Sequence, residues 1–492
     1  MDVQKKFREW TPEQYVSQTI TPADVLPEHD LVFFVLETVP RIELSAFYAY
    51  YEPETRGAPP FSVPMMCTLL VYAYSIGVFS SRKIAAACER NLGFLAIVGF
   101  QRPDFRTISE FRKHHLDAFE DLFVKVLRLA AEAGMVKLGN LALDGTKIKA
   151  NASRHKAMSY GYMTKEVERL RAEIQALTRQ AQQTDAEEDA ALGSRRGDEL
   201  PDELKRREDR LAVIEEAMKR LEAEARQKAE AEQRRRDQAQ AEREATGKKG
   251  GGRPAKPVDP TPEEKAQTNF TDAESKIMKT SNKGFDYTYN VQAAVEEEHQ
   301  IIVCPDVTGD ANDKQQAGPM AKKTREMLEA AGILTPAGTE EATAEGALAE
   351  QLEAEPSPPP EATVTKEKIP MSMDNGYFSE QAVTAVEAEG FDPHIAVGRQ
   401  KHNQPQGAEV EGSPLETATA QEKMAHKLRT PAGRACYAKR KQIVEPVFGQ
   451  IKQARGFRQF LLRGLRKVRA EWRLICLTHN LLKIWRHQCA LI

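Results

Sequence analysis

Strand signals that lie far apart in the chain are the feature that most limits the possible folds. The apolar run 141–143 in LALDGTKIKANAS ends on Asp144, and the next strands are predicted only after residue 284. There, FDYTYNVQAAVEE and HQIIVCPDVTG alternate as the two strands of a hairpin, with EEEHQ between them. The long segment that separates these strands differs in composition, so we interpret it as an insertion.

This insertion, over residues 162 to 247, is rich in Glu, Arg, Ala, Gln and Lys. Its sparse apolar residues recur at intervals of three, four and seven, which is typical of a coiled-coil seam. They form two runs: Val167, Leu170, Ile174 and Leu177, then Leu204, Leu211, Ile214, Met218 and Leu221. Gly193, Gly197 and Pro201 separate the runs, so we predict an antiparallel helical hairpin with a solvated, mixed-charge face. The Gly/Pro-rich stretch KKGGGRPAKPVDPTPEEK then serves as a linker.

The sequence pattern of residues 1 to 138 predicts helices and no strands. DLVFFVLETV, VPMMCTLLVYAYSIGV and ISEFRKHHLDAFEDLFVKVLRLAAEAG carry apolar residues at helical spacing, and Thr107 with Glu110 predicts a capping box for the last helix. In SSRKIAAACERNLGFLAIVGF, Ser80 or Ser81 caps one short helix and a second follows the turn at 91–93. This arrangement resembles a helix-turn-helix, and plain packing in a small helical bundle is the alternative.

The remaining elements follow the hairpin. We predict a helix over 313–331, an acidic, Pro-rich insert, a strand in KIPMSMDNGYFS that ends on Asp374, a helix over 380–389, a strand in PHIAVGR and a basic helical end. Without the two inserts, the order is that of a ribonuclease-H-like fold, a mixed α/β sheet flanked by helices.

This topology brings acidic side chains together. Its first and fourth strands are neighbours, so Asp144 and Asp374 are expected near the middle of the sheet, and a helix beside them can present Glu445. Three carboxylates this close repel one another unless cations intervene, and Mg²⁺ or Mn²⁺ suits their hard oxygens. Two ions about 3.5–4 Å apart support in-line displacement at a phosphodiester.

Each acid also has a local interpretation. Asp144 followed by glycine is a turn signal, and Glu445 has Lys439 and Lys441 as potential ion-pair partners on its helix. Asp306, Asp310 and Asp313 are explained as turn and helix-capping residues, and they remain alternatives for the second carboxylate.

Charge placement indicates the partner. The formal net charge of the chain is −3, yet residues 422–487 hold seventeen Lys or Arg and three acids, a net of +14. A strongly cationic segment with interleaved aromatic residues, such as GFRQFLLRGLRKVRAEW, suits nucleic-acid phosphates. The six cysteines form no CxxC pair, the N-terminus lacks a signal-peptide pattern and no apolar run is long enough for a bilayer, so we expect a cytoplasmic protein without a membrane partner.

Three blocks carry a specific resemblance. LALDGTKIKANAS, SMDNGYFS and YAKRKQIVEPVFGQIK resemble the catalytic blocks of bacterial insertion-sequence DDE transposases, and the helical region around residues 30–130 resembles the N-terminal domain of that family. The resemblance implies that Asp144, Asp374 and Glu445 are the metal-binding triad. It also implies that Tyr437, Arg440 and Lys452 contact DNA, although the family signature has three residues between its Arg and Glu and this chain has four. From the basic segment we also predict three arginines as DNA contacts: Arg455, Arg458 and Arg463.

The resemblance implies cleavage and strand transfer at terminal inverted repeats, with two Mg²⁺ or Mn²⁺ ions per site, double-stranded DNA as partner and a homodimer assembled on it. The alternatives are an inactive or domesticated sequence-specific DNA-binding protein and a nuclease without strand transfer. We divide the chain into a helical DNA-binding domain (1–138), a catalytic domain (139–160, 266–335 and 365–492, the last with the basic end), a helical-hairpin insert with linker (161–265) and an acidic insert (336–364).

Overall fold

The computed structural model describes residues 8–9, 21–52, 58–192, 202–246, 257–280, 284–335, 368–398, 409–410, 412–415 and 417–491. The acidic insert at 336–364 and the Gly-rich start of the linker lie outside these ranges. The chain forms two compact units, one of residues 1–150, 278–284 and 288–492, the other of residues 151–277 and 285–287. None of the described helices is long and apolar enough to cross a membrane.

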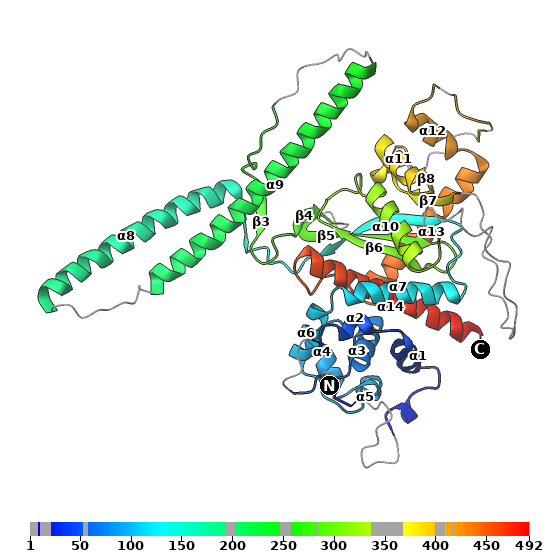
Figure 1. The fold of residues 1–492 in the computed structure, drawn as a ribbon, viewed down its shortest axis with the longest axis horizontal. Helices are drawn as coiled ribbons and strands as arrows, with labels where there is room; N and C mark the ends of the chain where they lie inside the picture. The colour runs from blue at the N-terminus through cyan, green and yellow to red at the C-terminus, as the bar shows by residue number, and fades with distance from the viewer. Residues whose placement is uncertain are drawn as a thin grey trace, which may run out of the picture. The chain divides into compact units, whose positions relative to one another are not determined.

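The larger unit contains the mixed sheet (Figure 1). Its strands are β1 (Leu141–Lys149), β4 (Lys276–Lys279), β5 (Phe285–Glu296), β6 (Ile302–Thr308), β7 (Ile369–Met373) and β8 (Phe391–Ile395). They follow the order β4-β5-β1-β7-β8, and β6 also pairs with β5. β1 is antiparallel to β5 and parallel to β7, which in turn is parallel to β8. The predicted ribonuclease-H-like sheet is therefore confirmed.

β1 is longer than the sequence predicts. It continues six residues beyond Leu143 to Lys149, paired throughout with β5, so the Asp144–Gly145 pair lies inside a strand and is not a turn. The interpretation of Asp144 as a turn residue is thus wrong. Strand pairing outweighs the local turn preference of Asp-Gly here, because every position from 141 to 149 has a partner on β5.

Helices precede and flank the sheet. The N-terminal ones are η1 (Ala23–Val25), α1 (Leu31–Thr38), η2 (Val39–Arg41), α2 (Ser45–Tyr48), α3 (Val63–Ser75), α4 (Ser81–Ala87), α5 (Leu92–Val98), α6 (Phe105–His114) and α7 (Ala118–Glu132). The later ones are α10 (Ala317–Ala330), η3 (Asn375–Tyr377), α11 (Glu380–Ala388), α12 (Ala420–Lys427), α13 (Pro431–Gly449), a π-helical turn (Gln450–Ala454) and α14 (Leu465–Leu491).

Several helix boundaries differ from prediction: the helix predicted from Ile108 onward is two helices, α6 and α7, and α10 begins at Ala317 instead of Asp313. Asp104, not Thr107, caps α6, because its carboxylate accepts a hydrogen bond of 2.7 Å from the backbone N–H of Arg106. The predicted capping box is therefore wrong. α4 begins after Ser80, as predicted, whereas α5 begins directly after Asn91 and includes Leu92 and Gly93 of the predicted turn. Most of α5 is buried, including Phe94, so this helix serves packing and the small-bundle alternative describes it better.

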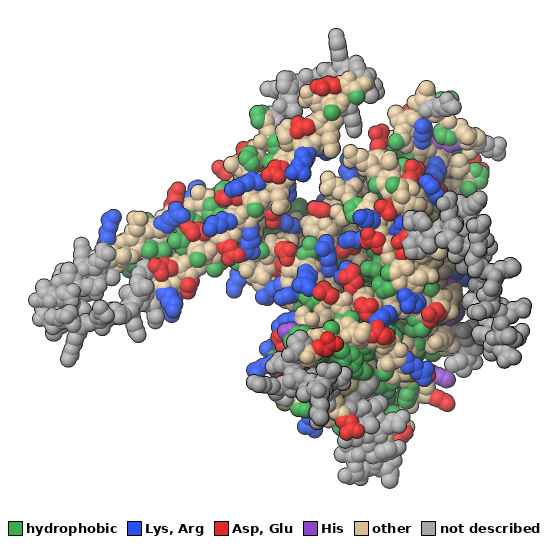
Figure 2. Space-filling model, viewed as in Figure 1, with side chains coloured by type: hydrophobic (Ala, Val, Ile, Leu, Met, Phe, Trp, Pro, Cys, Tyr) green, Lys and Arg blue, Asp and Glu red, His purple; other side chains and the backbone are tan. Residues whose placement is uncertain are grey.

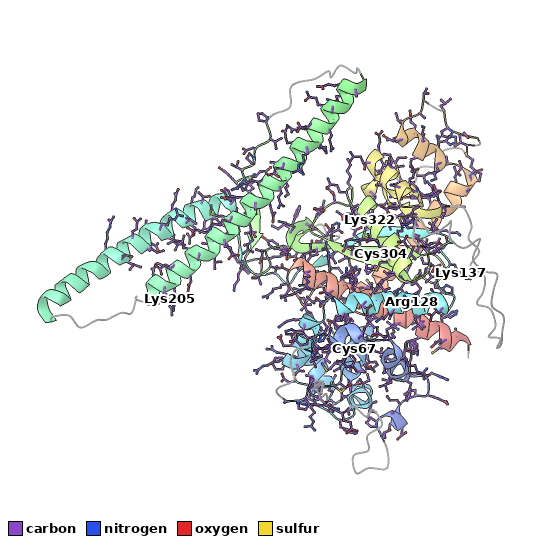
Figure 3. The ribbon with its side chains drawn as sticks, in the orientation of Figure 1. Cys67, Arg128, Lys137, Lys205, Cys304 and Lys322 are labelled. Atoms are coloured by element: carbon purple, nitrogen blue, oxygen red, sulfur yellow. The ribbon has the colours of Figure 1, made fainter. Side chains whose placement is uncertain are left out.

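The N-terminal helices pack onto the end of the chain. α14 contacts α7, α3 and β6, and α7 and α14 run side by side in Figure 1. The buried Arg112 donates hydrogen bonds to Tyr74 Oη at 2.6 Å and Ser81 Oγ at 2.8 Å, and the buried Glu471 of α14 accepts from the backbone N–H of Leu462 at 2.9 Å. On α7, Arg128 (Figure 3) donates to the carbonyl of Ala330, which closes the C-terminus of α10.

The smaller unit is the predicted helical pair, α8 (Tyr160–Leu192) and α9 (Asp202–Thr246), with the two-stranded sheet of β2 (Ala157–Ser159) and β3 (Gln267–Asn269). Its apolar seam contains Met163, Val167, Leu170, Ile214, Ala217 and Leu221. The contacts Tyr160–Glu222, Arg171–Glu215 and Glu173–Arg207 connect later positions of α8 to earlier positions of α9, so the two helices are antiparallel. Acidic and basic side chains alternate over both helices in Figure 2, as predicted for a solvated face.

Candidate active site

Two strand positions bring Asp144 and Asp374 together. Leu143 of β1 is the register partner of Met373 on the parallel strand β7. Asp144 follows Leu143 within β1, and Asp374 follows Met373 directly after the end of β7. The predicted adjacency of the first and fourth core strands is therefore present. Asp144 Oδ1 accepts from the N–H of Gly145 at 2.8 Å, and Asp374 caps η3 by accepting from the N–H of Gly376 at 2.7 Å.

Asp144 is held in a mostly buried environment, with its side chain 19% exposed. Burial raises the pKa of its carboxyl to about 6, and the nearby charge of Asp374 acts in the same direction. The guanidinium of Arg440 opposes both effects, because Nη1 donates to Asp144 Oδ2 at 3.1 Å. Arg440 is itself buried, so in this structure it provides the counter-charge for Asp144.

Helix α13 follows β1 along its length. Asn140 donates to the carbonyl of Cys436 at 3.3 Å, Arg440 contacts Asp144, and Lys452 in the π-helical turn donates to the carbonyl of Lys147 at 3.0 Å. Lys452 also donates to Thr146 Oγ1. Successive positions from 436 to 452 therefore face successive positions of β1.

Glu445 lies between Arg440 and Lys452 along this stretch of the chain, and it is exposed to solvent. The seven-residue spacing predicts Glu445 and Lys452 on one helical side, but the π-helical turn that begins at Gln450 lies between them. Glu445 is exposed, whereas Lys452 reaches β1. Its carboxylate does not form, with Asp144 and Asp374, a set of three ligand atoms within 4.8 Å; in the described part of the chain, Glu296, Glu298 and His299 form the one such set.

That set has a local explanation. The carboxylate of Glu296 accepts from the backbone N–H groups of Glu298 and His299 at 2.8 and 2.9 Å, which closes the turn between β5 and β6. Glu298 pairs with Lys137 at 2.8 Å. The oxygens that face this turn are thus engaged in structural bonds.

A third acid, Asp313, stands close to the strand ends. Its Oδ1 accepts from Asn290 Nδ2 and Gln292 Nε2, both at 2.7 Å, and Lys147 Nζ lies 4.0 Å away. The interpretation of Asp313 as a helix cap is wrong, since Gln316 holds the N-cap position of α10. A sequence signal did exist: Asn290 and Gln292 are amides two apart in the central part of the strand β5, so both face one side of the sheet.

Gly145 has a packing reason. A Cβ built on it would lie 2.8 Å from Asp313 Oδ1 and 3.1 Å from Asn290 Oδ1, and closer still to the Gln292 amide. Only a residue without a side chain allows Asp313 to approach the backbone beside Asp144.

The predicted DNA contacts differ in accessibility. Tyr437 is partly buried against the Arg440 guanidinium, which lies 6.0 Å from its ring, and burial lowers the pKa of Lys452 to about 8. Arg455 is directed into the protein, where it donates to Thr478 Oγ1 at 2.8 Å and to the carbonyl of Ile475 at 3.1 Å. Arg458 and Arg463 are exposed.

Comparison with known proteins identifies two parts of the chain. A family model described as "Transposase domain (DUF772)" matches residues 22–114, and one described as "Transposase DDE domain" matches residues 400–485. No curated protein and no solved structure matches the chain. The first match covers the N-terminal helices, and the second covers α13 with Arg440 and Glu445. Together with the mixed sheet and its paired aspartates, these two matches support an insertion-sequence transposase with a DDE domain.

Proposed function

We propose that this transposase cleaves DNA at the terminal inverted repeats of its element and joins the freed 3′-OH to target DNA. Such an enzyme acts on phosphodiester bonds as a nuclease and nucleotidyl transferase. The observation that carries the proposal is the parallel pairing of β1 with β7, which places Asp144 beside Asp374 in a cluster of carboxylates and cations.

The donor set suits a divalent cation. Asp144, Asp313 and Asp374 offer hard carboxylate oxygens, and Asp313 approaches the backbone beside both of the other acids. Its Oδ1 lies 2.8 Å from a Cβ built at Gly145, and its Oδ2 lies 3.8 Å from a Cβ built at Gly376. We propose that Asp144 and Asp374 hold two Mg²⁺ or Mn²⁺ ions and that Glu445 completes the set. Bound ions of this kind activate an attacking oxygen and stabilise a leaving one in phosphodiester displacement.

The residues around the acids have separate roles in this proposal. Arg440 orients the Asp144 carboxylate and neutralises part of its charge. Tyr437 of α13 and Lys452 of the π-helical turn after it contact DNA next to the acids, with Arg458 and Arg463 beyond them. We omit Arg455 from the DNA contacts because its guanidinium bonds to α14.

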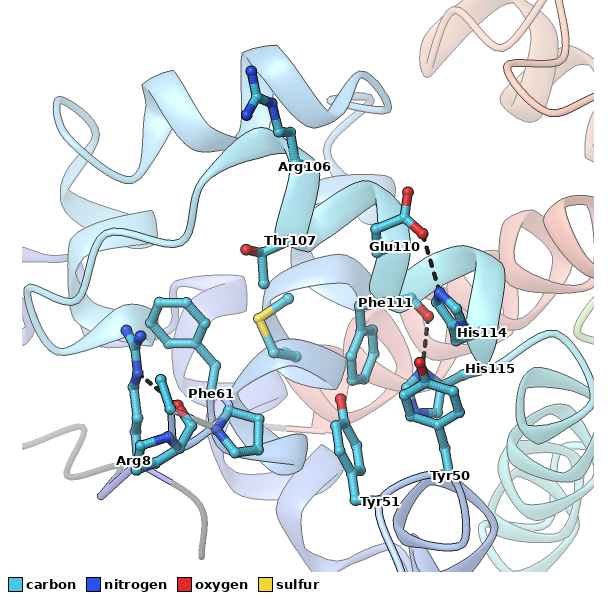
Figure 4. Close-up of a pocket in the computed structure, with 14 residues that line it drawn as sticks. Arg8, Tyr50, Tyr51, Phe61, Arg106, Thr107, Glu110, Phe111, His114 and His115 are labelled. Carbon is cyan, nitrogen blue, oxygen red and sulfur yellow. Dashed lines mark hydrogen bonds and ion pairs between the residues drawn. The ribbon is translucent and has the colours of Figure 1, made fainter. Parts of the chain in front are cut away.

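The N-terminal helices are proposed to bind the inverted repeats through α6. Two guanidinium groups flank the Phe105 ring, Arg82 at 5.1 Å and Arg106 at 5.6 Å from its centroid, and both arginines are exposed. A cavity of about 500 Å³ opens beside the same helix, with Arg106 and Thr107 on one side and Tyr50 and Tyr51 on the other (Figure 4). Cations beside aromatic surface suit DNA phosphates and sugars. Two copies of the chain are expected on the DNA, since two ends must be joined.

The proposal is tested by incubating the full chain with end-labelled inverted-repeat DNA and Mg²⁺. Joined products are expected. Asp144→Asn, Asp374→Asn and Glu445→Gln are each expected to reduce cleavage by at least about 10³-fold, because each removes metal-binding charge, and to leave end binding within a few-fold. Nicks without joined products would indicate a nuclease, and normal cleavage by any of the three variants would show that its acid is not part of the site.

A further inference from the structure

Asp313 lies between Asp144 in the strand β1 and Asp374 directly after the strand β7. Its Oδ1 lies 2.8 Å from a Cβ built at Gly145, directly after Asp144, and its Oδ2 lies 3.8 Å from a Cβ built at Gly376, two residues after Asp374. The two oxygens of one carboxylate therefore face the backbone beside both aspartates. No such proximity follows from its position in the chain, since it comes from the loop between β6 and α10.

The hydrogen bonds of Asp313 hold it in one orientation. Asn290 and Gln292 both donate to Oδ1 at 2.7 Å, and Tyr377 donates in turn to Gln292 Oε1. Asn290 and Gln292 are buried in β5, so this support is rigid. Among the described residues, no hydrogen-bond donor reaches Oδ2, which leaves that oxygen directed at the strand ends.

Among the residues that the structure describes, the charged groups at this point do not balance one another. The carboxylates of Asp144, Asp313 and Asp374 all act on Lys147, whose Nζ lies 4.0 Å from Asp313, and Arg440 pairs with Asp144. Three carboxylates thus face two cations. A site of this kind has affinity for a further cation with a preference for oxygen ligands.

We propose that Asp313 is a fourth carboxylate of the active site, which binds a divalent cation together with Asp144 and Asp374. This inference rests on the proposed function of these two aspartates. Helix capping does not explain the position of Asp313, because Gln316 holds the N-cap position of α10. A role as a metal ligand does explain it.

Asp313→Asn tests the role of the charge alone. The amide oxygen of an asparagine can still accept from Asn290 and Gln292, so the hydrogen bonds remain while the charged Oδ2 is lost. Mn²⁺ binding to the full chain is measured from the paramagnetic resonance signal of free Mn²⁺, with and without end DNA. The variant is expected to bind Mn²⁺ at least about ten-fold more weakly than the parent protein. DNA cleavage is expected to fall with it, and the thermal unfolding midpoint without metal is expected to stay unchanged or rise.

Asp310→Asn is the matched control. Asp310 is in the same loop, and its Oδ2 accepts from Thr308 Oγ1 and Gln316 Nε2, away from the strand ends. Its variant is expected to bind Mn²⁺ like the parent protein. Unchanged Mn²⁺ binding and cleavage by Asp313→Asn, with Asp144→Asn defective in both, would overturn the inference and leave the proposed function intact. A parent protein that neither binds Mn²⁺ nor cleaves DNA would overturn both.

Discussion

At the scale of single residues, the burial of a titratable side chain affects the stability of the folded state. His479 is fully buried in α14, and its Nε2 lies 3.1 Å from the carbonyl oxygen of Gln300, to which it donates as a neutral imidazole. Burial lowers its pKa to about 3, and the charges of Arg455, Lys483 and Arg486 act in the same direction. The folded state therefore excludes a proton that the unfolded chain takes up readily.

This exclusion predicts a pH-dependent stability. With a folded pKa of about 3 and an ordinary value of 6.5, the unfolded chain binds more protons between these values, so stability is lost as pH falls below 6.5. His479 is expected to account for a loss of about 2 kcal/mol between pH 7 and pH 5. His479→Gln keeps an N–H donor for Gln300 and should flatten that part of the profile. Urea unfolding at several pH values measures it; identical slopes for parent and variant would contradict the assignment.

At the scale of elements, α13 and the turn after it set the position of the site. Pro446 lies inside the helix and has no N–H for the carbonyl of Gln442, and Gln300 Nε2 donates to that carbonyl instead at 2.9 Å. Four residues later the π-helical turn begins, which contains Lys452. Helical irregularity thus lies between the proposed ligand Glu445 and the lysine that contacts β1.

A double-mutant cycle tests this compensation. Gln300→Met removes the donor, and Pro446→Ala restores the helical N–H, so the loss of stability from Gln300→Met should be smaller in the Pro446→Ala background. We expect a coupling of about 1 kcal/mol in the free energy of unfolding by urea. Contacts of Gln300 with Lys483 are lost in both backgrounds and cancel. Strict additivity of the two substitutions would show that the bond to Gln442 is not significant.

At the scale of the whole molecule, much of the basic C-terminal segment neutralises acids of the larger unit. Seven of its cations form ion pairs with acids elsewhere: Lys427 with Asp392, Arg434 with Glu409, Lys439 with Glu297, Arg440 with Asp144, Arg466 with Asp117, Arg469 with Asp306 and Arg473 with Glu120. Exposed cations without an ion pair to the described residues include Lys423, Lys441, Arg458 and Lys467. The net charge of +14 therefore overstates the charge available to DNA.

The salt dependence of DNA binding should reflect this smaller number. If about four phosphates are neutralised, affinity for end DNA is expected to fall about 10²-fold between 50 and 200 mM salt. Lys441→Ala should reduce the slope of log affinity against log salt by about one, because it removes one phosphate contact. Arg41→Ala, which removes a cation already paired with Glu37, should leave the slope unchanged. A slope near zero in the parent protein would remove this segment from the DNA interface.

The sequence by itself determined the order of the main core elements, the helical pair α8 and α9 and the closeness of Asp144 to Asp374. These depend on periodic apolar patterns and on a topology that allows few arrangements. Tertiary structure decided that β1 continues through Asp144–Gly145, that Asp313 approaches both aspartates, and that Arg440 and Arg455 turn inward. Those outcomes depend on contacts between residues far apart in the chain, where burial and neighbouring charge outweigh local turn and capping preferences.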